Sequence, residues 1–275
     1  MREAFRAAGV EIDLRIMKPA EIEKAIRAEA EAGAELIGAA GGDGTLSAAA
    51  NALTGTASAL LPIPLGTLNH FSNRYAIGSI EAAVHAYERR HITQVHVGAL
   101  NERIFVNNAS CGFYPHVVRH RDNIERVLPR VPSMLLAGIR VLVAWPMMKL
   151  KLEIGGMQKQ LRTPALWVGI GRNSLRLPVP GDAEVEGNVL EIVAGRADSR
   201  RHIVRLAVRL LWHLRRGLEP QGRDLVVEHA SAFTLNAPHP IDVALDGEAF
   251  RMRGPLKFAL RPNALRVVCL VASGS

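Results

Sequence analysis

Residues 34–45 read AELIGAAGGDGT, and the fold of the first part of the chain can be inferred from them. Its apolar first half is typical of a buried parallel strand, which ends in a glycine-rich loop. An alanine-rich helix follows and continues to about Leu53. Glycines let backbone N–H groups approach a phosphate closely, and the positive end of the following helix attracts the same anion. The order of strand, glycine loop and helix therefore predicts a phosphate-binding site.

Two side chains of this loop have expected roles. The carboxylate of Asp43 would lie beside the phosphates, where it can hold Mg²⁺ or orient a hydroxyl. Thr45 is expected to cap the following helix. The alternative is a glycine-rich turn in which Asp43 is only a local cap, and the position between a strand and a helix favours the phosphate loop.

A second loop, PIPLGTLNHF over residues 62–71, leaves another short apolar strand through Gly66 and Thr67. Taken alone, this segment predicts only a loop at a strand end. It follows the first loop by about 25 residues, which is the length of one crossover unit. Both loops would then lie at the carboxyl edge of one parallel sheet, where α/β proteins bind their ligands.

The distribution of helix and strand patterns along the chain predicts two domains. Helical and strand patterns alternate up to residue 90, which includes an alternating strand pattern over 10–17, and this order indicates an α/β domain with a parallel sheet. From His91 onward, short β-rich runs recur between turn residues, as in an antiparallel sandwich. Helical insertions interrupt these runs near 116–143 and 199–216. We therefore expect an α/β domain over 1–90 and a β-sandwich domain over 91–275.

The composition excludes several classes of protein. Apolar residues make up 48% of the 275 residues, which is enough for a large core, and two cysteines exclude a disulfide framework and favour a reducing compartment. The net charge of +8 favours polyanionic partners. Aromatic residues make up only 5%, so we expect no specific nucleic-acid partner. The ten histidines lack metal-ligand spacing, and no stretch is typical of a signal peptide or a membrane span.

Four motifs, in this order along most of the chain, resemble the diacylglycerol kinase catalytic-domain family, which includes bacterial lipid kinases and sphingosine and ceramide kinases. They are GGDGT at 41–45, PLGTLNHF at 64–71, NASCGF at 108–113 and LDGE at 245–248. The resemblance implies an ATP-binding α/β domain joined to a C-terminal β-sandwich for the lipid substrate, with the active site in the cleft between them. It implies transfer of the γ-phosphoryl group of ATP to the hydroxyl of diacylglycerol or a related lipid, with Mg²⁺.

The resemblance also assigns roles to residues. Those expected to hold the nucleotide phosphates lie in the first loop and its helix: Gly41, Gly42, Asp43, Gly44, Thr45, Leu46 and Ser47. Those expected to contact the nucleotide from the second loop are Gly66, Thr67 and Asn69. Asp246 or Glu248 would be the general base on the lipid hydroxyl and would face the glycine loop across the interdomain gap. From the residues alone, Asp246-Gly247-Glu248 predicts a hairpin turn between two strands.

The sequence departs from the family pattern in places that bear on activity. The family opens with a strand and an N-P-x-S-G loop, whereas this sequence begins in what would be the first helix, so we expect an N-terminally incomplete nucleotide-binding domain. The first alternative is therefore a catalytically impaired homologue that binds lipid or nucleotide. The second is an NAD kinase, a family that shares GGDGT, although its usual Asn-Glu pair is not found. A divalent-metal site that some bacterial members form is expected to be absent, because Gly187 replaces its second carboxylate.

The segment 199–216, SRRHIVRLAVRLLWHLRR, predicts an amphipathic helix. Arg205, Arg209 and Trp212 lie on one stripe, which suits an anionic membrane interface. An ordinary surface helix with solvated arginines explains the pattern equally well. We expect a cytoplasmic protein that associates peripherally with membranes and takes a lipid alcohol as its substrate, and we keep a homodimer as an alternative to a monomer.

Overall fold

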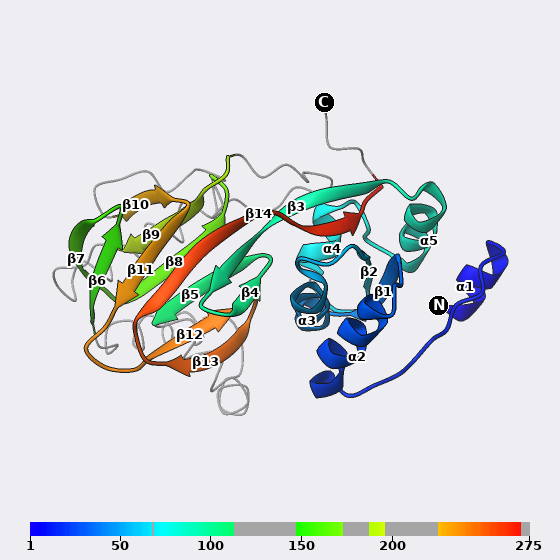
Figure 1. Cartoon of the computed structure of the whole chain (residues 1–275), viewed down its shortest axis with the longest axis horizontal. Coiled ribbons are helices and arrows are strands. Elements are labelled where there is room, and N and C mark those ends of the chain that lie inside the picture. Colours follow the sequence, from blue (N-terminus) through cyan, green and yellow to red (C-terminus); the bar gives the residue numbers. More distant parts are fainter. Residues whose placement is uncertain (68, 113–146, 173–186, 196–224, 271–275) are drawn as a thin grey trace, which may run out of the picture. The chain divides into compact units, whose positions relative to one another are not determined.

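The computed structural model describes residues 1–67, 69–112, 147–172, 187–195 and 225–270, and these form two compact units (Figure 1). Unit 1 contains Met1–Asn107 and Leu260–Ser275. Unit 2 contains Asn108–Arg176 and Val189–Ala259. The first unit thus continues past residue 90, and it also contains the end of the last strand, β14 (Leu256–Val268). The helical insertions predicted near 116–143 and 199–216 lie outside the described residues.

Unit 1 is an α/β unit. Its elements are α1 (Arg2–Ala7), α2 (Pro19–Glu31), β1 (Leu36–Gly41), α3 (Asp43–Leu53), β2 (Ala59–Pro64), α4 (His70–Arg74), α5 (Ile80–Arg89), β3 (Ile92–Leu100), β4 (Arg103–Phe105) and the end of β14 (Leu256–Val268). β1 pairs in parallel with β2, and β2 pairs in parallel with the end of β14. The parallel sheet is therefore confirmed. The strand expected over 10–17 does not form, and Ile16 is 94% exposed.

The two faces of this sheet carry separate cores. Leu60 on β2 packs with α2 and α3, whereas its neighbours Ala59 and Leu61 pack with α1 and α5. Successive residues of a strand point to opposite faces, so an all-apolar β2 is buried on both sides. The helices therefore cover both faces of the strands that lead into the two loops.

Unit 2 is antiparallel. One sheet has the order β10–β9–β8–β5–β12–β13, and the strands of the other that lie in unit 2 have the order β14–β11–β6–β7. Their bounds are β5 (Asn108–Gly112), β6 (Met148–Ile154), β7 (Met157–Thr163), β8 (Ala165–Ile170), β9 (Leu190–Gly195), β10 (Leu225–Ala230), β11 (Ala232–Asn236), β12 (Ile241–Leu245) and β13 (Glu248–Met252). Phe233 stacks on Phe258 with ring centroids 4.6 Å apart. The predicted combination of a parallel α/β domain and an antiparallel β domain is confirmed. Within the described ranges, every helix is too short or too polar to span a bilayer.

Candidate functional site

The first glycine loop leads directly into α3. Gly42 is the N-cap of this helix, and because glycine has no side chain, the first-turn N–H groups receive no side-chain cap there. The expectation that Thr45 caps the helix is therefore wrong. Thr45 lies in the first turn, and its side chain packs over Gly41, where an added Cβ would lie 2.4 Å from the threonine Oγ1. The unbonded N–H groups at the positive end of α3 remain suited to an anion.

The second loop lies against the first. Gly41 is opposite Pro64 in the parallel pairing, and the N–H of Leu65 donates to the carbonyl oxygen of Gly41 at 3.0 Å. The backbones then approach closely: a Cβ added to Gly66 would lie only 2.6 Å from the Cα of Gly42. The structure thus brings both predicted loops together at the carboxyl edge of the sheet.

Side chains of the two loops fix their shape. The N–H of Phe71 donates to Oδ1 of Asp43 at 3.1 Å, which ties α4 to the first loop. Asn69 has a left-handed backbone, and its side-chain amide accepts from the N–H of Gly66 at 2.9 Å and donates to the Gly66 carbonyl at 2.8 Å. Asn69 therefore shapes the second loop, while Thr67 is exposed beside it.

Leu46 and Ser47, the last two residues predicted to hold the phosphates from the first loop and its helix, are more deeply buried than the glycines. Leu46 is fully buried, and Ser47 is 8% exposed, so the side chains of both point away from solvent. Gly44 is half-buried in the first turn of α3. The backbone N–H of Leu46 donates to the carbonyl oxygen of Gly42 at 3.1 Å, so the helix already uses this donor.

The acidic motif forms a tight hairpin in unit 2. Asp246 and Gly247 join β12 to β13, and both have left-handed backbones with φ of 46° and 90°. These are the conformations of a type I′ turn, for which Asp-Gly is a preferred pair. The hairpin turn predicted from the residues is therefore confirmed.

The backbone of Asn108 is hydrogen-bonded to Asp246, one of the two acidic residues of this hairpin. The N–H of Asn108 donates to Oδ1 of Asp246 at 3.0 Å, and the N–H of Asp246 donates to the carbonyl oxygen of Asn108 at 2.9 Å. Glu248 instead pairs with Leu245 and is exposed. The structure therefore joins the NASCGF and LDGE motifs, a contact that sequence reasoning missed because the two lie far apart along the chain.

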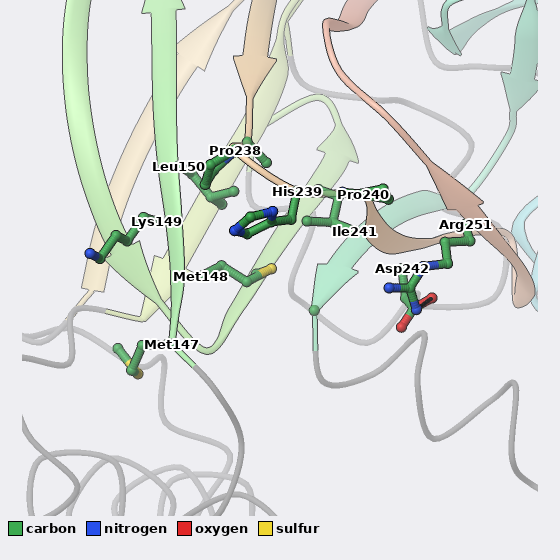
Figure 2. A pocket seen from close by; sticks show the side chains of 12 residues that line it. Met147, Met148, Lys149, Leu150, Pro238, His239, Pro240, Ile241, Asp242 and Arg251 are labelled. Atoms are coloured by element: carbon green, nitrogen blue, oxygen red, sulfur yellow. Dashed lines mark ion pairs between the residues drawn. The ribbon is translucent and has the colours of Figure 1, made fainter.

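A pocket of about 700 Å³ lies in the same unit (Figure 2). Its lining is mostly apolar and comes from the start of β6, the segment before β12, and the hairpin strands. Figure 2 shows Met148 and His239 among the side chains that line the pocket, together with Asp242 and Arg251. Asp242 and Arg251 form a cross-strand ion pair with a 3.8 Å separation. An apolar pocket with a few polar groups suits a small amphipathic molecule.

The cysteines do not offer a nucleophile. Burial raises the pKa of the Cys111 thiol to about 12, and it also raises the pKa of Cys269. Thiols of this kind stay protonated and unreactive at neutral pH. The glycine loops belong to unit 1 and the acidic hairpin to unit 2, and the facing of the two stays a prediction.

Comparison with known proteins finds similarity to diacylglycerol kinases and other lipid kinases. Residues 1–100 match the family model described as "Diacylglycerol kinase catalytic domain". The chain is 28% identical over 272 residues to a "Probable lipid kinase YegS-like" of Pseudomonas aeruginosa, which covers 96% of this chain and 86% of the relative. It is 24% identical over 217 residues to a "Diacylglycerol kinase" of Staphylococcus aureus, which covers 76% of this chain and 67% of the relative.

Solved structures share the fold. A diacylglycerol kinase from Bacillus anthracis superposes with a TM-score of 0.65 at 17% identity, over 93% of this chain and 84% of that one. An NAD kinase from Archaeoglobus fulgidus in complex with ATP superposes with a TM-score of 0.55 at 13% identity, over 97% and 87%. The chain thus shares the fold of these two kinases. The match to the diacylglycerol kinase catalytic domain thus covers the first 100 residues, and relatives that align with most of the chain are named as lipid kinases.

Proposed function

We propose that this chain is an ATP-dependent lipid kinase that transfers the γ-phosphoryl group of ATP to the hydroxyl of diacylglycerol or a related lipid. The observation that carries the proposal is the meeting of two glycine loops at one sheet edge, with Gly66 directly against Gly42. Such an approach presents backbone N–H groups without side chains in the way, which is what a polyphosphate requires.

In unit 1, the nucleotide phosphates would bind at Gly41, Gly42 and Gly44 and at the N-terminus of α3. Mg²⁺ bound with ATP would neutralise charge on the phosphates. The half-buried carboxylate of Asp43 is the group of this loop that can approach such an ion, since carboxylate oxygen is a preferred magnesium ligand. Its bond to the N–H of Phe71 keeps the carboxylate in a fixed position.

In unit 2, we assign the general base to Asp246 rather than Glu248. Asp246 is half-buried and held by two hydrogen bonds to Asn108, and a base acts best from a fixed position. In the transfer, the lipid hydroxyl loses its proton to this carboxylate as its oxygen bonds to the γ-phosphorus, and the bond to the ADP oxygen breaks. Positioning and charge neutralisation would supply most of the rate, as they do in phosphoryl transfer generally.

The apolar pocket offers a place for the lipid chains. Met148 and Pro238 contribute apolar surface there, and β12 links the pocket to the acidic hairpin, because Asp242 lies near the start of this strand and Asp246 directly follows its end. At about 3.3 Å per residue, the two positions lie about 13 Å apart. In the cell, the net charge of +8 favours docking to an anionic membrane surface.

The proposal is tested by incubating the purified chain with γ-labelled ATP and Mg²⁺. Separate reactions contain diacylglycerol, ceramide, sphingosine or NAD, and the labelled products are resolved by chromatography. Label in a lipid phosphate supports the proposal, and the preferred acceptor identifies the substrate. Formation of NADP would favour an NAD kinase instead. Lipid or nucleotide binding without any transfer would favour a catalytically impaired homologue.

A further inference from the structure

Ser110, at the centre of β5, carries a buried hydroxyl that its surroundings do not satisfy. The residue is 2% exposed, and its Oγ makes no hydrogen bond within the part of the chain that the structure describes. Leaving such a group unpaired destabilises the folded protein. Native proteins contain few of these groups, so each one calls for an explanation.

The position of Ser110 on its strand offers an explanation for the unpaired hydroxyl. Alternation along β5 places Asn108, Ser110 and Gly112 on the same face of the sheet. Asn108 is bonded to Asp246, and Gly112 lines the apolar pocket. At about 3.3 Å per residue, Ser110 lies about 7 Å along the strand from each of them. The hydroxyl is thus midway between the proposed base and the proposed place of the lipid chains.

The sheet around Ser110 has small residues on this face. Ala244 of β12 is directly opposite it, and next to Ala244 on β13 lies Ala249. On the other neighbouring strand, β8, the larger side chain of Trp167 is directly opposite Ser110. The alanine side chains fill little space on this flank of the buried hydroxyl, and Gly112, two residues along β5, lines the pocket.

We propose that the Ser110 hydroxyl hydrogen-bonds the polar backbone of the lipid substrate, at the ester or neighbouring oxygen between the reacting hydroxyl and the chains. This assignment deepens the lipid-kinase function proposed above and rests on it. In a 1,2-diacylglycerol, one ester oxygen is on the carbon next to the one that bears the reacting hydroxyl, and Ser110 lies two residues along β5 from Asn108, which binds Asp246. Ser110 is on this account a substrate-positioning residue, and it has no part in proton transfer.

The test compares Ser110→Ala with a matched control. Ser58 is also a serine with 2% exposure, but its hydroxyl donates to the carbonyl oxygen of Ala34 at 2.5 Å in unit 1. Removing an unpaired hydroxyl leaves the free protein equally stable or more stable, whereas removing a paired one destabilises it. We therefore expect an unchanged or higher melting temperature for Ser110→Ala and a lower one for Ser58→Ala.

Kinetics and binding are measured on the same proteins with dioctanoylglycerol in mixed micelles. For Ser110→Ala, we expect kcat/KM for this lipid to fall about tenfold, the effect of one lost hydrogen bond, with the KM for ATP unchanged. Without ATP, the lipid should raise the melting temperature of the wild type more than that of Ser110→Ala. For Ser58→Ala, we expect the wild-type lipid kcat/KM.

Each outcome separates this inference from the proposed function. A lipid-dependent thermal shift that Ser110→Ala weakens, without phosphate transfer by the wild type, would support the Ser110 site while the kinase proposal fails. Wild-type values of lipid kcat/KM and thermal shift in Ser110→Ala would overturn the inference even if the kinase is active. A loss of stability equal to that of Ser58→Ala would overturn it too. A wild type with neither shift nor transfer would overturn both.

Discussion

The contact between the two glycine loops can be broken by a single methyl group. In Gly66→Ala, the new Cβ would lie 2.6 Å from the Cα of Gly42 and 2.9 Å from Oδ1 of Asn69. Non-bonded carbon atoms need about 3.5 Å, so the loops must separate by about 1 Å. Overpacking of this kind costs about 1–3 kcal/mol. A displacement of about 1 Å in a reacting group can lower a rate about 100-fold.

Gly42→Ala provides the matched control. Its Cβ would lie 3.5 Å from the Cα of Gly66, which is ordinary contact, and the φ of −84° at this residue is allowed for alanine. We expect a loss of less than about 1 kcal/mol in stability, from the poorer N-cap. ATP binding should still weaken, because the methyl group would stand where the phosphates approach.

Urea unfolding and ATP binding by calorimetry measure both effects. Gly66→Ala should lose stability and nucleotide affinity together, and Gly42→Ala should lose mainly affinity. Equal stability of the wild type and Gly66→Ala would refute the close approach of the loops. Unchanged ATP binding in both variants would refute their assignment to the phosphates.

Three further predictions concern the supporting structure. The side-chain amide of Asn51 donates to the carbonyl oxygens of Ser47 at 3.0 Å and Ile104 at 3.2 Å, and it accepts from the N–H of Ile104 at 2.9 Å. Asn51→Ala should therefore lower the free energy of unfolding, measured in urea, by about 2–4 kcal/mol. A loss under about 1 kcal/mol would contradict the contribution of these bonds. Ser79 caps α5, and Ser79→Ala should lower the free energy of unfolding by about 1 kcal/mol; a thermal melt that matches the wild type would argue against the cap. The pKa of Cys111 is raised from 9.0 to about 12, so above pH 9 the thiol ionises only in the unfolded state and wild-type stability falls by up to about 1.4 kcal/mol per pH unit. The stability difference between wild type and Cys111→Ala should therefore narrow from pH 9 to pH 11, and parallel curves would contradict the burial argument.

Much of the fold follows from local patterns. The strand over 34–40, the glycine loop and the alanine-rich helix were predictable because the apolar run, the glycines and the helix formers all agree. β8 and β12 are short β-rich runs between turn residues, of the kind predicted for the chain after residue 91. β7 and β13 were not predicted, because both are edge strands, where exposed and charged side chains replace the alternating apolar pattern.

The remainder depended on contacts between distant segments. Residues 10–17 alternate like a strand, yet alternation forms a strand only where a partner exists, and no described strand pairs with them. The return of β14 to the first unit is likewise a long-range pairing. In the site, the loops were predictable from their glycines. The bond between Asn108 and Asp246 was not, because 138 residues separate them.

Phosphoryl transfer to a lipid with Asp246 as the base is tested by comparing two variants that each remove one carboxylate. Asp246→Asn keeps an oxygen for the Asn108 N–H and suits a type I′ turn, so it removes the base without removing the fold. Glu248→Gln makes the same change of charge two residues away, on an exposed side chain. With labelled ATP and diacylglycerol, the account predicts a kcat about 10²–10⁴ lower for Asp246→Asn and a much smaller change for Glu248→Gln. Full activity of Asp246→Asn, or a larger loss in Glu248→Gln, would contradict it.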